Sequence, residues 1–283
     1  MCGISGVLAP VGRGTQRSQR DLAGAMAATL RHRGPDASDT WADRSGRVAL
    51  GHTRLAIVDL SEAGAQPMTS RDGRWTITYN GEVYNTDDLR RSLGSVGWRG
   101  HSDTEVLVEH IARNGVEATL NAAKGMFAFG CWDAHEAELW LARDRFGEKP
   151  LYFGFHQGSL LFASELKALR AVPGFNPDID RQALVEYFQW INVPSPMTIY
   201  EGVSKLPPAH FLRVGEPTGV VGPQPYWSAI EAARDAPPLS ADVDGVDQLC
   251  EGLDRSVGAQ MVSDVPLGAF LSGGIDSSSV VAS

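Results

Sequence analysis

Hydrophobic and polar positions follow two periods along the chain, one typical of helices and the other of strands. Between residues 22 and 30 an apolar side chain recurs at every fourth position, which predicts a helix with one buried face. Between residues 75 and 79 large apolar side chains alternate with Thr76 and Thr78, the pattern of a strand buried on one face only. The first 212 residues combine both periods and predict an α+β domain.

Shorter segments complete this prediction. Apolar runs predict a strand at residues 2–8 and two hairpins, formed by residues 126–132 with 138–142 and by residues 151–155 with 159–163. Helical spacing returns at residues 184–191 and 246–257. Ser102 and Glu105 have the spacing of a capping box, so we expect a helix to begin there.

The composition changes between residues 214 and 241, where five prolines and several glycines are typical of a linker. Farther along, residues 265–271 predict a buried strand, followed by a glycine turn and a helix from Ser277. We therefore expect a first domain at residues 1–212, a linker at 213–241 and the start of an α/β domain at 242–283.

The overall composition is that of a folded protein, with 43% hydrophobic and 21% charged residues among 283. A net charge of −9 argues against a nucleic-acid surface or a basic membrane anchor. No run of about 18 apolar residues predicts a transmembrane helix, and the first residues lack the pattern of a secretory signal. The three cysteines are far apart, so neither a disulfide framework nor a zinc site is expected, and a reducing cytoplasm fits best.

Cys2 directly follows the initiator methionine. One explanation is that small residues are common at this position. The other is chemical, because removal of Met1 would give Cys2 a free α-amino group beside its own thiol. This amine titrates near ~8, so at neutral pH it can take the thiol proton, directly or through water. Nucleophile and general base would then belong to one residue, with no histidine required.

Seven segments of the chain, the first of which contains Cys2, carry the resemblance to a known family. They are MCGISGV (1–7), RHRGPD (31–36), GHTRLAIVD (51–59), YNGEVYN (79–85), SDTE (102–105), GMFAFGCWD (125–133) and RDRFGEKPLYF (143–153). The chain thereby resembles the class II, N-terminal-nucleophile glutamine amidotransferases. With LSGGIDSS (271–278) it resembles the glutamine-dependent asparagine synthetases among them, over nearly its whole length. The resemblance implies a four-layer αββα sandwich of the N-terminal-nucleophile type, followed by a truncated α/β domain of the ATP-pyrophosphatase type.

The resemblance places the catalytic centre at Cys2, Asn80 and Gly81. Attack of Cys2 on the glutamine amide creates an oxyanion that needs preorganised donors, which the Asn80 side-chain amide and the Gly81 N–H can supply. Glycine lets the main chain approach closely and adopt a positive φ. Taken locally, a plain Asn-Gly turn after a strand is the favoured interpretation, and only the family context reverses it.

Glutamine must also be held by its α-carboxylate and α-ammonium groups. Arg54 offers a bidentate fork for the carboxylate, while Asp103 and Glu82 offer negative partners for the ammonium. The alternatives are a surface or interdomain ion pair for Arg54 and a helix N-cap for Asp103. The resemblance implies a glutamine-binding set of Arg54, Leu55, Ala56, Ile57, Val58, Asn80, Gly81, Glu82 and Asp103, with the RHRGPD loop helping to enclose it.

The SGGIDSS segment follows an apolar run and precedes a predicted helix. Consecutive N–H groups at a glycine turn before a helix form an anion-binding nest, and the segment resembles the pyrophosphate loop of ATP-pyrophosphatases. A tight strand–helix connection is the alternative. The resemblance implies ATP and Mg²⁺ as cofactors of this half and none for glutamine hydrolysis. The implied ATP-binding residues are Leu271, Ser272, Gly273, Gly274, Asp276 and Ser277, with Asp276 as the magnesium ligand.

The implied reaction is amidation of aspartate, through β-aspartyl-AMP, by ammonia released from glutamine. Its partners are small molecules, namely glutamine, ATP and aspartate, with no nucleic acid and no membrane, and a homodimer is expected of a full-length member. A doubly wound sheet cannot be completed by the few residues after SGGIDSS. We therefore expect the chain to be a truncated synthetase that hydrolyses glutamine but forms no asparagine.

Three alternatives remain open. A related synthetase could amidate another carboxylate, in a metabolite or a peptide, and its acceptor site would distinguish it. A class II enzyme acting on a sugar phosphate or phosphoribosyl pyrophosphate is disfavoured by SGGIDSS. A non-catalytic binding protein that retains the fold is disfavoured by Cys2.

Overall fold

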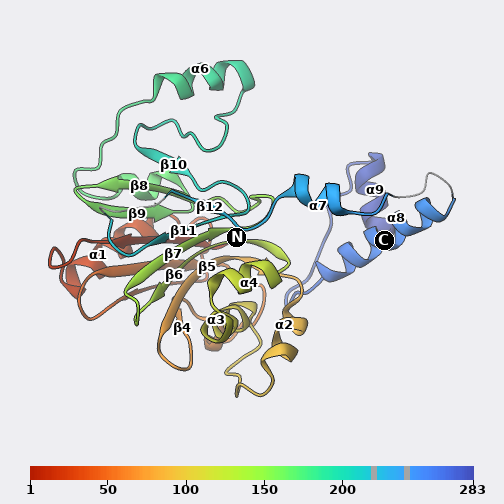
Figure 1. The fold of residues 1–283 in the computed structure, drawn as a ribbon, viewed down its shortest axis with the longest axis horizontal. Coiled ribbons are helices and arrows are strands. Elements are labelled where there is room, and N and C mark those ends of the chain that lie inside the picture. Colours follow the sequence, from red (N-terminus) through yellow and green to blue (C-terminus); the bar gives the residue numbers. More distant parts are fainter. Residues whose placement is uncertain (218–221, 239–242) are drawn as a thin grey trace.

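The computed structural model describes residues 1–217, 222–238 and 243–283. Within these residues, two six-stranded antiparallel sheets lie face to face, and helices cover their outer faces (Figure 1). Apolar side chains from both inner faces, including Ile4, Leu50 and Leu141, form the core between the sheets. The four-layer αββα prediction is confirmed.

The first sheet has β1 near its centre. Its order is β10 (Val203–Lys205), β8 (Tyr152–His156), β9 (Ser159–Ala163), β1 (Gly3–Leu8), β3 (Val48–Arg54) and β2 (Ala37–Ala42). α1 (Gln16–Ala28) and α5 (Leu166–Arg170) pack on its outer face. Met26 and Leu30 from the predicted apolar stripe are fully buried there, although Leu30 lies just beyond the end of α1.

The second sheet carries most of the residues expected at the site. Its order is β12 (Gln224–Pro225), β11 (His210–Val214), β7 (Glu138–Arg143), β6 (Gly125–Asp133), β5 (Trp75–Val83) and β4 (Met68–Thr69). α3 (Asp103–Asn114) packs on its outer face, and α2 (Thr86–Leu93) and α4 (Val116–Ala122) pack on α3. The two predicted hairpins are β6–β7 and β8–β9.

The prediction that residues 75–79 form a half-buried strand is wrong in its burial. Thr76 and Thr78 are as buried as Ile77 between them. The apolar face of β5 packs against α3, whereas the threonine face meets the other sheet, where Thr78 donates a hydrogen bond to the carbonyl of Gly51. A central strand of a four-layer sandwich is covered on both sides, which an alternating pattern cannot show.

The start of α3 differs from a full capping box. Ser102 accepts a hydrogen bond from the N–H of Glu105, as predicted. The Glu105 carboxylate, however, accepts from the N–H groups of Arg99 and Gly100 rather than turning back to Ser102. Glu105 therefore fixes the loop that precedes α3.

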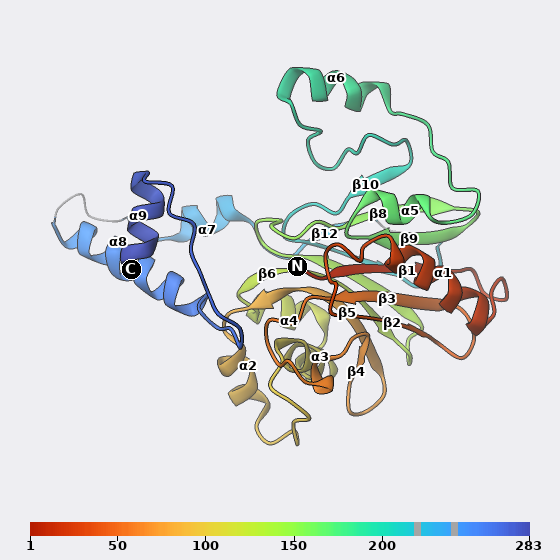
Figure 2. The same ribbon diagram turned by 180° about the vertical axis from the view of Figure 1, so that it is seen from behind.

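The remaining helices of the described chain do not belong to the layers that cover the two sheets. α6 (Arg181–Trp190) extends away from the sheets, α7 (Ala229–Asp235) lies in the region predicted as a linker, and α8 (Val243–Ala259) and α9 (Ile275–Ala282) lie to one side of the sandwich (Figure 2). A 3₁₀ turn, η1 (Glu62–Gly64), follows β3. Among the described helices none has the length and apolar character needed to span a bilayer.

The buried strand predicted at residues 265–271 is not formed. Phe270 is fully exposed and Leu271 is 62% exposed. An isolated apolar strand has no partners for its N–H and C=O groups, and no described strand lies beside this segment to supply them. Residues 265–271 therefore remain an extended connection between α8 and α9.

Candidate active site

Cys2 lies at the end of a central strand. β1 pairs with β3 on one side and β9 on the other, and the pairing of Gly3 with Thr53 brings Cys2 beside the loop after β3. The Cys2 sulfur lies 3.5 Å from the nitrogen and 3.7 Å from the oxygen of Leu55. A Cβ atom at position 3 would lie 2.6 Å from Thr53 Oγ1, so Gly3 permits this close approach.

A cluster of charges holds the backbone of Cys2. Arg33 donates from Nε to the Cys2 carbonyl oxygen and from a terminal nitrogen to Glu165, both at 2.9 Å. His32 and Lys167 also contact the Glu165 carboxylate. Partial burial would raise the pKa of Glu165, but hydrogen bonds from Arg33, His32 and Lys167 lower it to about 2. The carboxylate therefore stays charged and keeps Arg33 in place.

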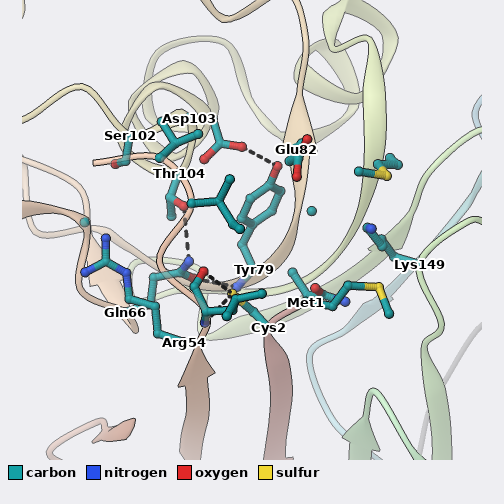
Figure 3. A pocket seen from close by; sticks show the side chains of 17 residues that line it. Met1, Cys2, Arg54, Gln66, Tyr79, Glu82, Ser102, Asp103, Thr104 and Lys149 are labelled. Atoms are coloured by element: carbon teal, nitrogen blue, oxygen red, sulfur yellow. Dashed lines mark hydrogen bonds between the residues drawn. The ribbon is translucent and has the colours of Figure 1, made fainter. Parts of the chain in front are cut away.

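A pocket of about 310 Å³ opens beside Cys2 (Figure 3). Its walls come from the loop after β3, from β5 and from the start of α3. The lining residues are Met1, Cys2, Arg54, Leu55, Ile57, Val58, Gly64, Gln66, Tyr79, Asn80, Gly81, Glu82, Ser102, Asp103, Thr104, Met126 and Lys149. The structure thus brings the predicted glutamine-site residues together, except for Ala56, whose N–H donates to Asp36 of the RHRGPD loop.

Asn80 and Gly81 lie inside β5, paired with Ala128 and Phe127, and do not form a turn. The Asn80 side-chain nitrogen is buried and has no hydrogen-bond partner in the structure. Gly81 does not have the positive φ that we expected of it. It is required instead by close packing, because a Cβ there would lie 2.4 Å from the carbonyl oxygen of Met126.

The N–H group of Gly81 points toward the pocket side of β5. N–H groups of a strand alternate between its two edges, so those of Tyr79, Gly81 and Val83 share one edge. The Tyr79 N–H donates to Gln66 Oε1 at 2.7 Å and the Val83 N–H to Asp103 Oδ2 at 3.1 Å. Gly81 lies between them, beyond the two residues of β5 that pair with β4. This arrangement offers a backbone donor beside the Asn80 amide.

Arg54 lies at the end of the pocket away from Lys149 (Figure 3) and is 9% exposed. Its guanidinium donates to the carbonyl oxygens of Asp59 and Ser61. Gly64 leaves room for it, since a Cβ atom there would lie 2.1 Å from a terminal nitrogen of Arg54. Two backbone acceptors thus orient the guanidinium, whose other N–H bonds can bind a carboxylate.

Two carboxylates lie on the other side of the pocket. Asp103 accepts hydrogen bonds from the Tyr79 hydroxyl at 2.7 Å and from the Val83 N–H at 3.1 Å. Burial raises the pKa of Asp103, against the opposing effect of these hydrogen bonds, and burial likewise raises the pKa of Glu82. Burial lowers the pKa of Lys149, which lines the same pocket. A ligand ammonium would restore the charge balance at Asp103 and Glu82.

Met1 occupies one side of the pocket, with its amine near Cys2 (Figure 3). Burial lowers the pKa of this amine and raises the pKa of the Cys2 thiol. A thiol with a raised pKa needs a base, and an amine with a lowered pKa is a better base at neutral pH. The lowered pKa is that of the Met1 amine, whereas the raised pKa of the Cys2 thiol is what requires a base nearby.

The sequence matches the family described as "Glutamine amidotransferase domain" over residues 1–227. The chain belongs to this glutamine amidotransferase family. Residues 248–283 match a second family, described as "Asparagine synthase". The family predicted from the sequence motifs is confirmed.

Curated relatives of this chain include two asparagine synthetases of Bacillus subtilis. Asparagine synthetase [glutamine-hydrolyzing] 3 is 39% identical over 290 residues, covering 100% of this chain and 45% of that protein. Asparagine synthetase [glutamine-hydrolyzing] 1 is 36% identical over 284 residues, covering 99% and 43%. Amidase chry2 of Gibberella zeae is 34% identical over 288 residues, covering 99% and 42%. The chain thus spans less than half the length of these relatives.

Two solved structures share this fold. The glutamine phosphoribosylpyrophosphate amidotransferase from B. subtilis superposes with a TM-score of 0.58 at 19% identity, over 99% of this chain and 63% of that one. A structure titled as the allosteric regulatory enzyme of purine biosynthesis gives 0.59 at 20% identity, over 94% and 59%. At this identity the likeness concerns the amidotransferase fold alone.

Several residues of this candidate site were not predicted from the sequence. Gln66 and Tyr79 fix the edge of β5, and Lys149 lines the pocket from the segment after β7. Arg33 holds the Cys2 carbonyl from within RHRGPD, where only a loop was expected. Arg33 lies in RHRGPD and Lys149 in RDRFGEKPLYF, and membership of these motifs was the one sequence signal that could have identified them. Gln66 lies outside every motif.

The SGGIDSS segment lies apart from the pocket. Gly273 has a φ of 81°, α9 begins without a side-chain cap, and the hydroxyl oxygens of Ser272 and Ser277 lie 2.9 Å apart. Such a turn fits a phosphate group. Leu271, Gly274 and Asp276 are exposed.

Proposed function

We propose that this chain hydrolyses glutamine at Cys2 and that the ammonia serves an ATP-dependent amidation of aspartate. The observation that carries the first half is the buried, unpartnered Asn80 amide in the same pocket as the Cys2 thiol. A buried donor without an acceptor costs free energy, and it is expected where a charged ligand atom completes the site. The Asn80 amide and the Gly81 N–H are the proposed oxyanion donors.

The reaction begins after removal of Met1. The α-amine of Cys2 takes the thiol proton, and the thiolate attacks the side-chain amide carbon of glutamine, whose oxygen becomes the oxyanion. Arg54 binds the α-carboxylate, and Asp103, with Glu82, binds the α-ammonium. The ammonium of Cys2 then returns its proton to the leaving nitrogen, so that ammonia departs and a thioester remains.

Hydrolysis of the thioester completes the cycle. The Cys2 amine takes a proton from water, and the resulting hydroxide attacks the thioester carbonyl with the same two donors on its oxygen. The C–S bond breaks, the thiolate recovers its proton and glutamate leaves. The backbone of Leu55, 3.5 Å from the sulfur, keeps the thiol in position throughout. Leu55, Ile57 and Val58 are proposed as the backbone wall of the glutamine site.

The second half of the proposal rests on residues 248–283 and on the asparagine synthetase relatives. Ser272, Gly273, Gly274 and Ser277 would hold the phosphates of ATP, Leu271 would contact the nucleotide and Asp276 would bind Mg²⁺. ATP supplies the activation of the acceptor carboxylate. The three cysteines are free, as suits the reducing cytoplasm that we propose as its location.

A second candidate differs only in the acceptor. Amidase chry2 and amidase chyE, which are 34% and 33% identical to this chain, carry names that do not specify aspartate. A related carboxylate acceptor is therefore the alternative to aspartate. Candidate acids tested with glutamine and ATP in a protein containing the complete synthetase domain would separate the two.

Glutamine hydrolysis is tested with the purified chain. Ammonia and glutamate should form in equal amounts with the wild type, and Cys2→Ala should abolish both. Intact mass should show loss of Met1 from the active material. A Cys2→Ala variant as active as the wild type would overturn the proposal, and so would an active chain that retains Met1.

A further inference from the structure

Asp264, in the extended segment between α8 and α9, touches the glutamine pocket from outside. Its N–H donates to the carbonyl oxygen of Ile57 at 2.9 Å, and its carboxylate accepts from the N–H of Asp59 at 2.6 Å. Asp264 is thus hydrogen-bonded to both ends of the segment 57–59. Ile57 and Val58 line the pocket, so Asp264 fixes part of its wall.

The same carboxylate reaches a second wall. His101 Nε2 lies 2.7 Å from Asp264 Oδ2, and the N–H of His101 donates to the Asp59 carboxylate at 2.9 Å. Asp103, the proposed partner of the substrate ammonium, follows His101 by two residues. Asp264 therefore joins two segments of the pocket wall. One is the loop after β3, beside Arg54, and the other is the segment that carries Asp103.

Asp59 connects this contact to Arg54. Its carbonyl oxygen accepts from the Arg54 guanidinium, and its N–H is the group that Asp264 binds. Asp59 has a φ of 56°, in the left-handed region that a non-glycine residue adopts only where its surroundings hold it there. The hydrogen bond that its N–H donates to Asp264 is one of the interactions that hold it. Loss of that bond would allow Asp59, and with it Arg54, to shift.

Among the described residues, Asp264 makes the hydrogen bonds that join the two parts at this place. A cavity of about 270 Å³ separates them, lined by Gln260, Val262 and Asp264 on one side and by residues such as Arg90 and His101 on the other. The Asp264 hydrogen bonds therefore lie at the edge of a cavity, and the Asp264 side chain is 38% exposed.

We propose that Asp264 is a positioning residue of the glutamine site, through which the asparagine synthase-like segment sets the spacing between Arg54 and Asp103. The inference rests on glutamine hydrolysis at Cys2 as the function. Since Asp264 touches no reacting atom, it acts on the binding of glutamine rather than on the chemical step. Its loss should therefore change KM and leave kcat nearly unaltered.

The test compares Asp264→Ala with Asp264→Asn in the full chain. Asp264→Ala should raise KM for glutamine by about 5–20-fold with kcat within about twofold of the wild type. Asp264→Asn keeps an oxygen acceptor for the Asp59 N–H and should recover most of the affinity. In a Cys2→Ala background, the Kd for glutamine measured by calorimetry should rise by the same factor, which separates binding from chemistry.

Asp254→Ala is the matched control, because Asp254 is an exposed acid on α8 and its replacement by alanine removes the same negative charge. It should leave KM unchanged. The inference is overturned if Asp264→Ala keeps the wild-type KM, if Asp254→Ala raises KM equally, or if kcat falls as much as affinity. A wild-type chain that releases no ammonia would instead refute the proposed function, so the two failures are distinguishable.

Discussion

Replacing Asn80 by alanine should separate activity from stability. The buried Asn80 side-chain nitrogen forms no hydrogen bond in the structure, so Asn80→Ala breaks no described hydrogen bond of this nitrogen. In the transition state, by contrast, it would donate to the oxyanion. Loss of one such donor typically lowers kcat by ~10²–10³, equivalent to ~2.7–4 kcal/mol.

The expected stability change is small and of either sign. Asn80→Ala removes packing atoms but also an unsatisfied polar group, whose burial costs about 1–3 kcal/mol. These effects oppose one another, so Tm should stay within about 4 °C of the wild type, which corresponds to about 1 kcal/mol for a domain of this size. KM should change little, because the donor acts mainly on the oxyanion.

The assay is steady-state ammonia release, paired with thermal unfolding of the same samples. Asn114→Ala is the control, since Asn114 is exposed at the end of α3. The oxyanion assignment fails if Asn80→Ala retains more than about a tenth of the wild-type kcat. A large drop in Tm would show that the Asn80 amide supports the fold, contrary to its lack of partners.

Two further substitutions test the binding end and the charge cluster. Arg54→Lys should raise KM for glutamine by about 10–100-fold with a smaller change in kcat, because lysine cannot form the bidentate pair; an unchanged KM would remove Arg54 from the carboxylate site. Glu165→Gln should lower Tm by its full amount at pH values above the usual carboxyl pKa of 4.5. The difference in Tm should shrink below pH 4.5 and vanish near pH 2, because the pKa of Glu165 in the folded protein is about 2. A Tm difference that is independent of pH would contradict the ion pairing with Arg33.

Two hairpins of the sheets were predictable because they join neighbouring segments, whereas the two-sheet sandwich was predicted from the family resemblance. β6–β7 and β8–β9 each need only a few intervening residues, so local alternation and turn residues suffice to identify them. The strand expected at residues 265–271 has the same apolar composition but lacks neighbours in the described chain. Its failure shows that an apolar run specifies a buried strand only where other strands are available to pair with it.

The candidate site was predictable where motifs carried the chemistry. Cys2, Arg54, Asn80 and Asp103 come from four separate segments, yet they line one pocket. What the sequence could not provide was the supporting contact of Gln66 with β5, or that of Arg33 with the Cys2 carbonyl. Such contacts depend on the spatial meeting of segments, which no local pattern encodes.

The central place of β1 has a consequence for biosynthesis. Ile4 donates a hydrogen bond to Ser164, 160 residues farther along, and β1 pairs with β9 over its last four residues. At roughly 5–20 residues per second, a ribosome makes that partner about 8–30 s after β1. During this interval one edge of an apolar strand has no partner, so chaperone binding to the nascent chain should concentrate on its earliest residues.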